Sequence, residues 1–152
     1  YGPRALGNRS ILIDPTKDDS MDRVNARVKF RDSWRPFAPS MLAEAADEYL
    51  VDPVEDPFMI TSFEVRPEKR DEIPAVTHVD NTTRPHMVRK DVNEPYWRLI
   101  KAFEERTGTP VLLNTSYNLS GDPIVSSPVD AIQTFYASGL DALVVGDRLL
   151  QK

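Results

Sequence analysis

Short strand-like runs and helix-like segments follow one another along this chain without a regular strand–helix–strand order. Apolar runs that end at turn-forming residues predict strands at 10–13, 58–65 and 110–113. An apolar stripe with helical spacing, stopped by Gly108, predicts a helix at 94–107. Because strict alternation is what builds a parallel sheet with helices between its strands, this order favours a mixed sheet in an α/β or α+β domain.

The remaining predicted elements are short and are separated by prolines and glycines. They comprise helices at 20–29, 43–50 and 128–138, an extended segment at 36–41, short strands at 76–79 and 85–89, a last core strand at 143–145 and an edge strand at 147–150. A chain of 152 residues matches the roughly 150 residues of a typical domain. We therefore expect one compact unit over residues 1–152.

Several classes of protein are excluded by what the sequence lacks. No apolar run approaches the roughly 18 residues that span a bilayer, so we expect no membrane partner. The absence of cysteine removes disulfides and thiolate nucleophiles, and two histidines leave little material for a metal centre, so no metal site is expected. The chain opens on Tyr1 without an initiator methionine or a signal peptide, which predicts an excised part of a longer protein. The localisation signals of that protein are not visible in this part, and we expect a cytoplasmic location.

The charge is unevenly distributed along the chain. Residues 1–40 carry 8 Lys and Arg against 5 Asp and Glu, whereas residues 41–75 carry 3 against 10. The net charge of −5 makes the chain a poor general binder of nucleic acid, so we expect no nucleic-acid partner. The basic N-terminal stretch suits a small anionic ligand, with an ordinary solvated basic face as the alternative.

The first candidate site segment is 2–10. Its two glycines allow positive backbone φ angles, and amides exposed in such turns bind anions. Arg4 and Arg9 add guanidinium groups, which bind phosphate oxygens through two parallel hydrogen bonds. An ordinary turn with solvated arginines is the alternative.

The second candidate segment, 29–37, alternates cations with aromatic residues. In a strand, this alternation would place Lys29, Arg31 and Arg35 on one side. Phe30 and Trp34 would then pack down on the other side, and the cations would line a cleft. A basic edge lying over core aromatics is the alternative.

The third and strongest candidate segment is 111–123. A buried apolar strand delivers Asn114, Ser116 and Asn118 at its C-terminal end, where α/β sheets present ligand-binding groups. Amide and hydroxyl groups are neutral hydrogen-bonding partners for phosphate or carbonyl oxygens. A polar surface loop is the alternative.

Isolated polar residues add little to these segments. Arg84 lies in a turn and is a candidate fourth cation, with exposure in a loop as the alternative. The acidic residues Asp52, Glu55 and Asp56 lie among prolines, and we expect a solvated loop rather than a metal site. His86 is expected to pack rather than to react.

Together these segments supply cations, amides and hydroxyls, which suit phosphoryl or nucleotidyl transfer. They also resemble the C-terminal domain of the O-carbamoyltransferases, a family that includes nodulation-factor and antibiotic-tailoring enzymes. Lys29 and Arg31, with Ser116 and Asn118, are similar to the K-x-R and S-x-N signatures of YrdC-like domains, which make carbamoyl adenylates. The stretches that carry the resemblance to the O-carbamoyltransferases are 2–12, 29–31, 34–40, 110–118, 128–131 and 139–141.

The resemblance implies a YrdC-like twisted mixed β-sheet flanked by helices, with ATP and carbamoyl phosphate in its concave cleft. In such enzymes, carbamate derived from carbamoyl phosphate attacks the α-phosphate of ATP and gives carbamoyl adenylate and pyrophosphate, with Mg²⁺ accompanying the ATP. A separate N-terminal Kae1-like domain, carrying Fe(II) or a similar metal, then moves the carbamoyl group to an acceptor hydroxyl. That domain is absent from this chain.

The resemblance also assigns roles to individual residues. The positions implied for catalysis are Lys29, Arg35, Arg84 and Ser116. The positions implied for binding ATP and carbamoyl phosphate are Arg4, Arg31, Asn114 and Asn118.

Three alternatives stay open at this stage. The chain could be a regulatory module that binds nucleotide without turnover, or an RNA-binding domain, or a tRNA-modification enzyme that makes threonylcarbamoyl adenylate from threonine and bicarbonate. Pyrophosphate release from ATP and carbamoyl phosphate would separate the enzyme from the module. A homodimer also stays open.

Overall fold

The computed structural model describes residues 5–30, 32 and 34–152. A four-stranded sheet lies at its centre, with the strand order β1-β6-β2-β5. These strands are β1 (Ser10–Ile13), β6 (Val111–Ser116), β2 (Ala38–Leu42) and β5 (His86–Val88). β6 runs antiparallel to both of its neighbours, whereas β2 and β5 are parallel. The mixed sheet expected from the irregular order of elements is therefore confirmed.

The sheet is organised around β6. Its first four residues are buried, because the strand has a neighbour on each edge. Asn114 in this strand lies opposite Leu12 of β1 and Ala38 of β2. A polar side chain is thereby placed in the middle of the sheet, and it needs hydrogen-bond partners there.

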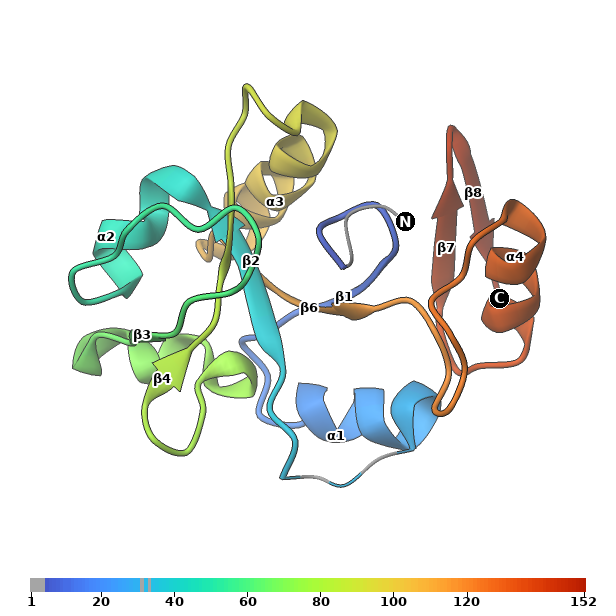
Figure 1. The fold of residues 1–152 in the computed structure, drawn as a ribbon, viewed down its shortest axis with the longest axis horizontal. Helices are drawn as coiled ribbons and strands as arrows, with labels where there is room; N and C mark the ends of the chain where they lie inside the picture. The colour runs from blue at the N-terminus through green and yellow to red at the C-terminus, as the bar shows by residue number, and fades with distance from the viewer. Residues whose placement is uncertain (1–4, 31, 33) are drawn as a thin grey trace.

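Two helical segments lie on either side of the central strands. α3 (Glu94–Thr107) has the predicted bounds: the Asn93 side chain caps its first turn and Gly108, at a φ of 81°, ends it. α1 (Ser20–Val24) continues into a π-helical turn, η1 (Asn25–Lys29). In Figure 1, α3 lies above β1 and β6, and α1 lies below them.

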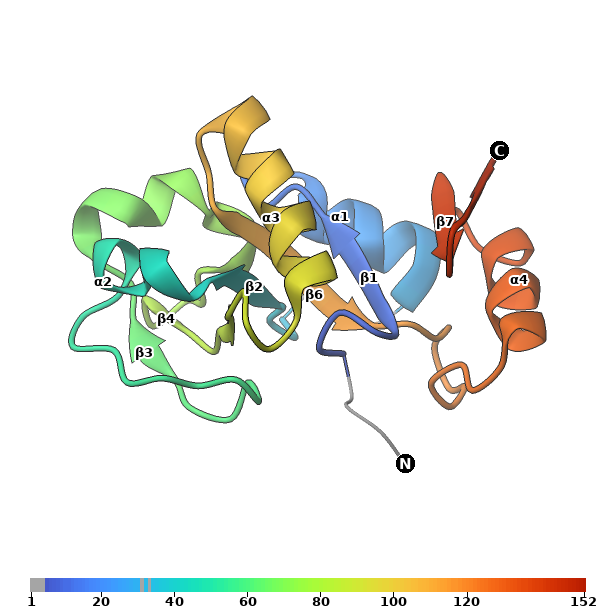
Figure 2. The ribbon, with the colours of Figure 1, turned by 90° about the horizontal axis from the view of Figure 1, so that it is seen from above.

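The C-terminal region forms a second, smaller core. α4 (Pro128–Tyr136) begins at Ser127, whose side chain and that of Asp130 form a reciprocal capping box. β7 (Ala142–Val145) and β8 (Arg148–Gln151) form a two-stranded sheet of their own. This pair and α4 stand to one side of the central sheet in both views (Figures 1 and 2). The strands expected at 143–145 and 147–150 are therefore confirmed, and they pair with each other rather than with the central sheet.

The segment between β2 and β5 is mostly irregular. It contains η2 (Ala43–Ala45), α2 (Ala46–Tyr49), β3 (Phe63–Glu64), η3 (Pro67–Glu72), η4 (Pro74–Val76) and β4 (Thr82–Thr83). The predicted strand at 58–65 is wrong except at β3, because the carboxylate of Asp56 accepts the backbone N–H groups of Phe58, Ile60 and Thr61. The predicted strand at 76–79 is also wrong, because Pro74 begins a helical turn there.

The alternation proposed for 29–37 does not occur in the residues of this segment that the structure describes, from which 31 and 33 are excluded. Lys29 ends a helical turn, and Phe30 follows in the left-handed region at a φ of 44°. Phe30 and Trp34, expected to pack down, are 65% and 74% exposed. The N–H of Phe30 donates to the carbonyl oxygen of Asn25, so the helical turn extends to the start of this segment. Lys29 and Phe30 therefore do not lie in a strand.

No helix in the described part of the chain combines the length and the hydrophobicity that crossing a bilayer requires.

Candidate functional site

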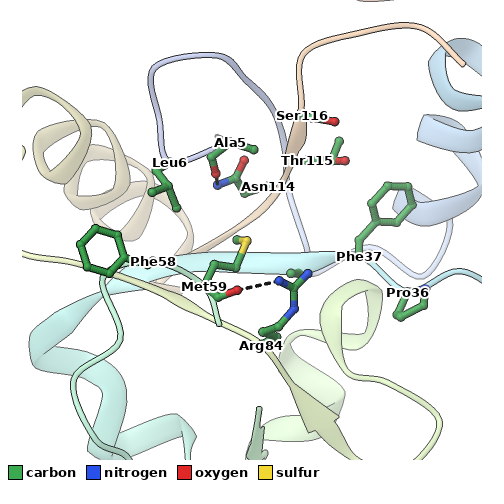
Figure 3. Close-up of a pocket in the computed structure, with 11 residues that line it drawn as sticks. Ala5, Leu6, Pro36, Phe37, Phe58, Met59, Arg84, Asn114, Thr115 and Ser116 are labelled. Carbon is green, nitrogen blue, oxygen red and sulfur yellow. Dashed lines mark hydrogen bonds between the residues drawn. The ribbon is translucent and has the colours of Figure 1, made fainter. Parts of the chain in front are cut away.

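An open pocket of about 230 Å³ lies where β6 ends (Figure 3). Five parts of the chain meet at it. Its lining residues are Ala5, Leu6, Pro36, Phe37, Ala38, Phe58, Met59, Arg84, Asn114, Thr115 and Ser116. The pocket therefore brings together segments that are distant in the sequence, as expected of a ligand site at the end of a strand.

Asn114 is fixed in orientation and has an unused acceptor. The side chain is only 2% exposed, and its Nδ2 donates to the carbonyl oxygen of Ala5 at 2.6 Å and to Ser40 Oγ at 2.7 Å. Because a carbonyl oxygen only accepts, the amide cannot be reversed. Its Oδ1 is buried and has no hydrogen-bond partner among the described residues. Asn114 lines the pocket, so this orphan acceptor lies next to the space that a ligand with an N–H or O–H donor would occupy.

Arg84 lies across the pocket from the end of β6 and is held at one atom. Its Nη1 donates to the carbonyl oxygen of Met59 at 2.6 Å (Figure 3). A guanidinium carries five N–H donors, so this contact leaves most of them for a ligand. We call Asn114 and Arg84, with the backbone of Ala5 and Met59 that holds them, the Asn114–Arg84 wall.

On the other side of β6, Lys29 enters a dense cluster of acceptors. Its side chain is buried, and Nζ lies 2.6 Å from the carbonyl oxygen of Ser116 and 3.1 Å from that of Asn118. Asn118 Oδ1 lies 2.9 Å from Nζ and Ser116 Oγ 3.3 Å from it. Ser116 Oγ donates to Asn118 Oδ1 at 2.6 Å. We call Lys29, Ser116 and Asn118 the Lys29 cluster.

The structure brings together most of the predicted site residues that it describes. Arg84, Asn114 and Ser116 line the pocket, and Lys29 and Asn118 join Ser116 in the Lys29 cluster. Ser116 thus belongs to both groups. This residue therefore both contacts the buried ammonium and lines the open pocket.

Arg35 does not join these residues. Its guanidinium lies 5.6 Å from the centre of the Trp34 ring, and the residue is absent from the pocket lining. Arg4 and Arg31 lie outside the described residues, so the roles predicted for them stay predictions.

A buried polar network behind Asn114 was not anticipated. Ser40 accepts from Asn114, and its Oγ lies 3.1 Å from His86 Nδ1, so the Ser40 proton can be donated to that nitrogen. Burial lowers the pKa of His86 to about 4, although the negative charge of Asp56 opposes the shift. The ring is therefore neutral at pH 7, with its own proton on Nε2 by inference from this pattern.

No local sequence signal could have revealed this network. Ser40, His86 and Asn114 come from β2, β5 and β6, and only the strand order makes them neighbours. The expectation that His86 packs is consistent with its burial and with its stacking on Tyr96, at 5.8 Å between ring centres.

The glycine-containing segment forms another part of the pocket wall. Gly7 has a φ of 96°, and its N–H donates to Ser10 Oγ at 3.0 Å. A Cβ at this position would come within 2.5 Å of Tyr96 Cδ1, so only glycine fits. Arg9 Nη1 donates to the carbonyl oxygen of Val125 at 3.1 Å, which ties this segment to the C-terminal core.

The chemistry available at this site is that of donors, one orphan acceptor and positive charge. Across the described ranges, no three His, Asp or Glu side chains are grouped so that they could hold a metal ion. The site can orient a polar anion and stabilise negative charge that develops on it.

Comparisons with known proteins identify the family and the relatives that this chain resembles. A family model described as Carbamoyltransferase C-terminus matches residues 1–152. The chain is 52% identical to the nodulation protein NolNO of Sinorhizobium fredii, over 100% of the chain and 23% of that protein. It is 36% identical to a 3'-hydroxymethylcephem-O-carbamoyltransferase of Amycolatopsis lactamdurans, over 99% of the chain and 28% of that enzyme. The chain thus spans about a quarter of the length of these curated relatives.

Proposed function

The chain belongs to the carbamoyltransferase C-terminus family, and from that premise we propose that it forms carbamoyl adenylate from ATP and carbamoyl phosphate. The observation that carries the proposal is the pocket that Arg84, Asn114 and Ser116 line together, with an orphan acceptor on Asn114. Cationic and neutral donors around a polar pocket are what nucleotidyl transfer requires of a protein.

The proposed formation of carbamoyl adenylate has two steps. Water cleaves carbamoyl phosphate to carbamate and inorganic phosphate. A carbamate oxygen then attacks the α-phosphorus of ATP, the bond to the bridging oxygen breaks, and pyrophosphate leaves. Charge develops on the α-phosphate oxygens and on the leaving group, so fixed positive charge lowers the barrier. Mg²⁺ enters with the ATP and is part of the substrate.

Asn114 recognises the carbamoyl group. Its Oδ1 can only accept a hydrogen bond, and phosphate oxygens are also acceptors, so a phosphate is the wrong partner for it. The carbamoyl amino group carries two N–H donors and complements this atom. The contacts from Nδ2 to Ala5 and Ser40 hold the acceptor in place before the ligand arrives.

The cationic residues bind the phosphates. Arg84 has N–H donors left after its contact with Met59, and these bind phosphate oxygens. Lys29 acts through Ser116, a residue that lines the pocket: the charge of Lys29 polarises the Ser116 hydroxyl, and Asn118 Oδ1 accepts the proton of that hydroxyl. Arg4 and Arg31 are further cations that the family resemblance assigns to the same anions, whereas Arg35, which it also assigns to them, does not line this pocket.

The acceptor of the carbamoyl group binds elsewhere in the protein. Because the chain spans about a quarter of its curated relatives, we assign the acceptor hydroxyl to the remaining part, a Kae1-like domain with its own metal. The printed names of the relatives concern nodulation and a cephem, and these describe those proteins. The acceptor of this protein is a hydroxyl compound.

Pyrophosphate release tests the proposal. The purified protein, incubated with ATP, Mg²⁺ and carbamoyl phosphate, should release pyrophosphate. Parallel incubations replace carbamoyl phosphate with threonine and bicarbonate, or omit it. Release only with threonine and bicarbonate would transfer the assignment to threonylcarbamoyl adenylate. Binding of ATP without release in any incubation would identify a nucleotide-binding module.

Residue variants test where the chemistry occurs. Ser116→Ala should reduce the rate of pyrophosphate release roughly 100-fold, the usual effect of losing one oriented polar group, because it removes the hydroxyl through which Lys29 acts. Ser126→Ala, in an exposed loop near α4, is the matched control and should retain the wild-type rate. Equal rates for the two variants would contradict the assignment of the pocket.

A further inference from the structure

The loop at 56–61 is folded around a buried carboxylate. Asp56 is only 2% exposed, and its Oδ1 accepts the N–H of Phe58 at 3.0 Å. Its Oδ2 accepts the N–H of Ile60 at 2.9 Å and that of Thr61 at 2.5 Å. Burial alone would raise the pKa of Asp56, but these backbone donors outweigh it and lower the pKa. The expectation that Asp56 lies in a solvated loop is therefore wrong.

The residue enclosed by these hydrogen bonds has a strained backbone. Met59 has a φ of 59°, in the left-handed region that residues other than glycine, asparagine and aspartate rarely adopt. The sequence around it favours a strand, as the apolar run at 58–65 indicates. The three hydrogen bonds to Asp56 are what hold the segment in its turn against that preference.

The strained residue carries the acceptor that holds Arg84. The carbonyl oxygen of Met59 accepts from Arg84 Nη1 at 2.6 Å, and both residues line the pocket (Figure 3). The direction of this carbonyl depends on the left-handed conformation of Met59. An extended backbone would turn the carbonyl away and release the guanidinium.

The loop is also fixed to the central sheet. The N–H of Met87 in β5 donates to the carbonyl oxygen of Asp56 at 2.9 Å. Arg84 lies just before the same strand, so the loop and the arginine share one rigid support. Strand β5 positions the backbones of Asp56 and Arg84, and the Asp56 carboxylate determines the shape of the loop at 56–61.

We propose that Asp56 is a positioning residue that sets the orientation of Arg84 in the pocket through the backbone carbonyl of Met59. The proposal rests on the proposed function only in that Arg84 is taken to bind the substrate phosphates. Asp56 itself touches no substrate. Its effect passes through the loop amides, the Met59 backbone and the guanidinium in turn.

The first experiment needs no activity. Asp56→Asn in the full protein retains the size of the side chain but replaces one acceptor oxygen with a donor, so it weakens the loop. Hydrogen exchange of the amides of Phe58, Ile60 and Thr61 should accelerate, and ¹⁵N relaxation at Arg84 Nε should report a more mobile side chain. Asp80→Asn is the matched control, because Asp80 accepts the N–H of Thr82 in an exposed turn. Unchanged Arg84 relaxation in Asp56→Asn would overturn the proposal even if the loop amides exchange faster.

The second experiment uses pyrophosphate release in a double-mutant cycle. Asp56→Asn should raise the KM for ATP roughly 10-fold or more, as expected when a binding group loses its orientation. In an Arg84→Ala background, the same substitution should have no further effect, because the arginine on which it acts is gone. Independent, additive effects would show that Asp56 acts only on stability and would overturn the proposal. Absence of release from the wild-type protein would refute the proposed function and leave the relaxation result standing.

A rescue variant separates the backbone mechanism from general destabilisation. Met59→Gly removes the strain of a positive φ, since glycine adopts it readily. In the Asp56→Asn background, it should restore part of the order at Arg84. Loss of order equal to or greater than that of Asp56→Asn alone would count against the Met59 backbone as the link.

Discussion

The Lys29 cluster and the Asn114–Arg84 wall lie on either side of Ser116, yet they use their polar groups in opposite ways. In the Lys29 cluster, the buried ammonium is surrounded by four oxygen atoms of Ser116 and Asn118. In the wall, Asn114 retains an orphan acceptor, and Arg84 makes one contact with a carbonyl. The Lys29 cluster therefore stabilises the fold and holds a fixed positive charge, whereas the Asn114–Arg84 wall retains polar groups for a ligand.

Removal of Lys29 should give the largest effect. Lys29→Met leaves the part-buried carbonyl oxygens of Ser116 and Asn118 without this donor, and charged hydrogen bonds contribute about 1.5–3 kcal/mol each. We expect the free energy of unfolding, measured in urea, to fall by roughly 3 kcal/mol or more. Lys17→Met, at an exposed lysine, is the control and should change it little. A loss below about 1 kcal/mol would remove the distinction between the two regions.

Arg84 should show the reverse pattern. Because Arg84 is exposed, Arg84→Ala should change the free energy of unfolding by less than about 1 kcal/mol. The rate of pyrophosphate release should nevertheless fall roughly 100-fold. Arg148→Ala, at an exposed arginine in β8, should leave both quantities unchanged. If Arg84→Ala lowered the free energy of unfolding in proportion to its loss of activity, Arg84 would have a structural role like that of Lys29.

Acid should weaken the Asn114–Arg84 wall through His86. Burial lowers the pKa of this ring to about 4 from an ordinary value of 6.5, so between those pH values the unfolded chain binds a proton that the folded chain does not. The free energy of unfolding should therefore fall as the pH drops from 6.5 to 4, by up to about 3 kcal/mol. Denaturation in urea across this range measures the slope.

The contribution of the ring can be isolated with His86→Gln, which cannot titrate. This variant should lose most of the slope between pH 6.5 and 4, while the carboxylates still act at lower pH. An unchanged slope would mean that other groups account for the acid sensitivity and that His86 is not the reason for it.

The smallest effect is expected at Gly7. Gly7→Ala places a Cβ against the Tyr96 ring and forces a left-handed φ on alanine, at a cost of about 1–3 kcal/mol. The segment that presents the Ala5 carbonyl to Asn114 should shift with it, so substrate binding should weaken with little change at Lys29. Gly121→Ala, also at a positive φ but with open space around it, is the control for backbone strain alone. Equal losses from both variants would mean that the contact with Tyr96 contributes nothing.

Local pattern made much of the fold predictable. The helix at Glu94–Thr107 and the strand at Ser10–Ile13 follow the predicted bounds, because capping residues, apolar spacing and turn formers all lie within a few positions of the element. The strand predicted at 58–65 fails for the opposite reason. There, one buried carboxylate outside the segment overrides its local preference.

The candidate site was likewise predictable only where the signal lay in the local sequence. Polar residues in a run after a buried strand indicated Asn114, Ser116 and Asn118, and the excess of cations indicated Lys29. The partners that give these residues their chemistry could not be read from the sequence. Ser40, His86 and the carbonyl oxygen of Met59 become neighbours of the site only through strand order and loop shape.

The order of strands in the sheet has a consequence for how the chain is made. Ser10 in β1 pairs with Ser116 in β6, so β1 waits for a partner that is synthesised roughly 100 residues later. β2 and β5 can pair earlier, since both precede β6. Contacts of such long sequence separation are slow to form. We therefore expect β6 to complete the sheet last, and the pocket at its end to exist only when synthesis of this region is nearly finished.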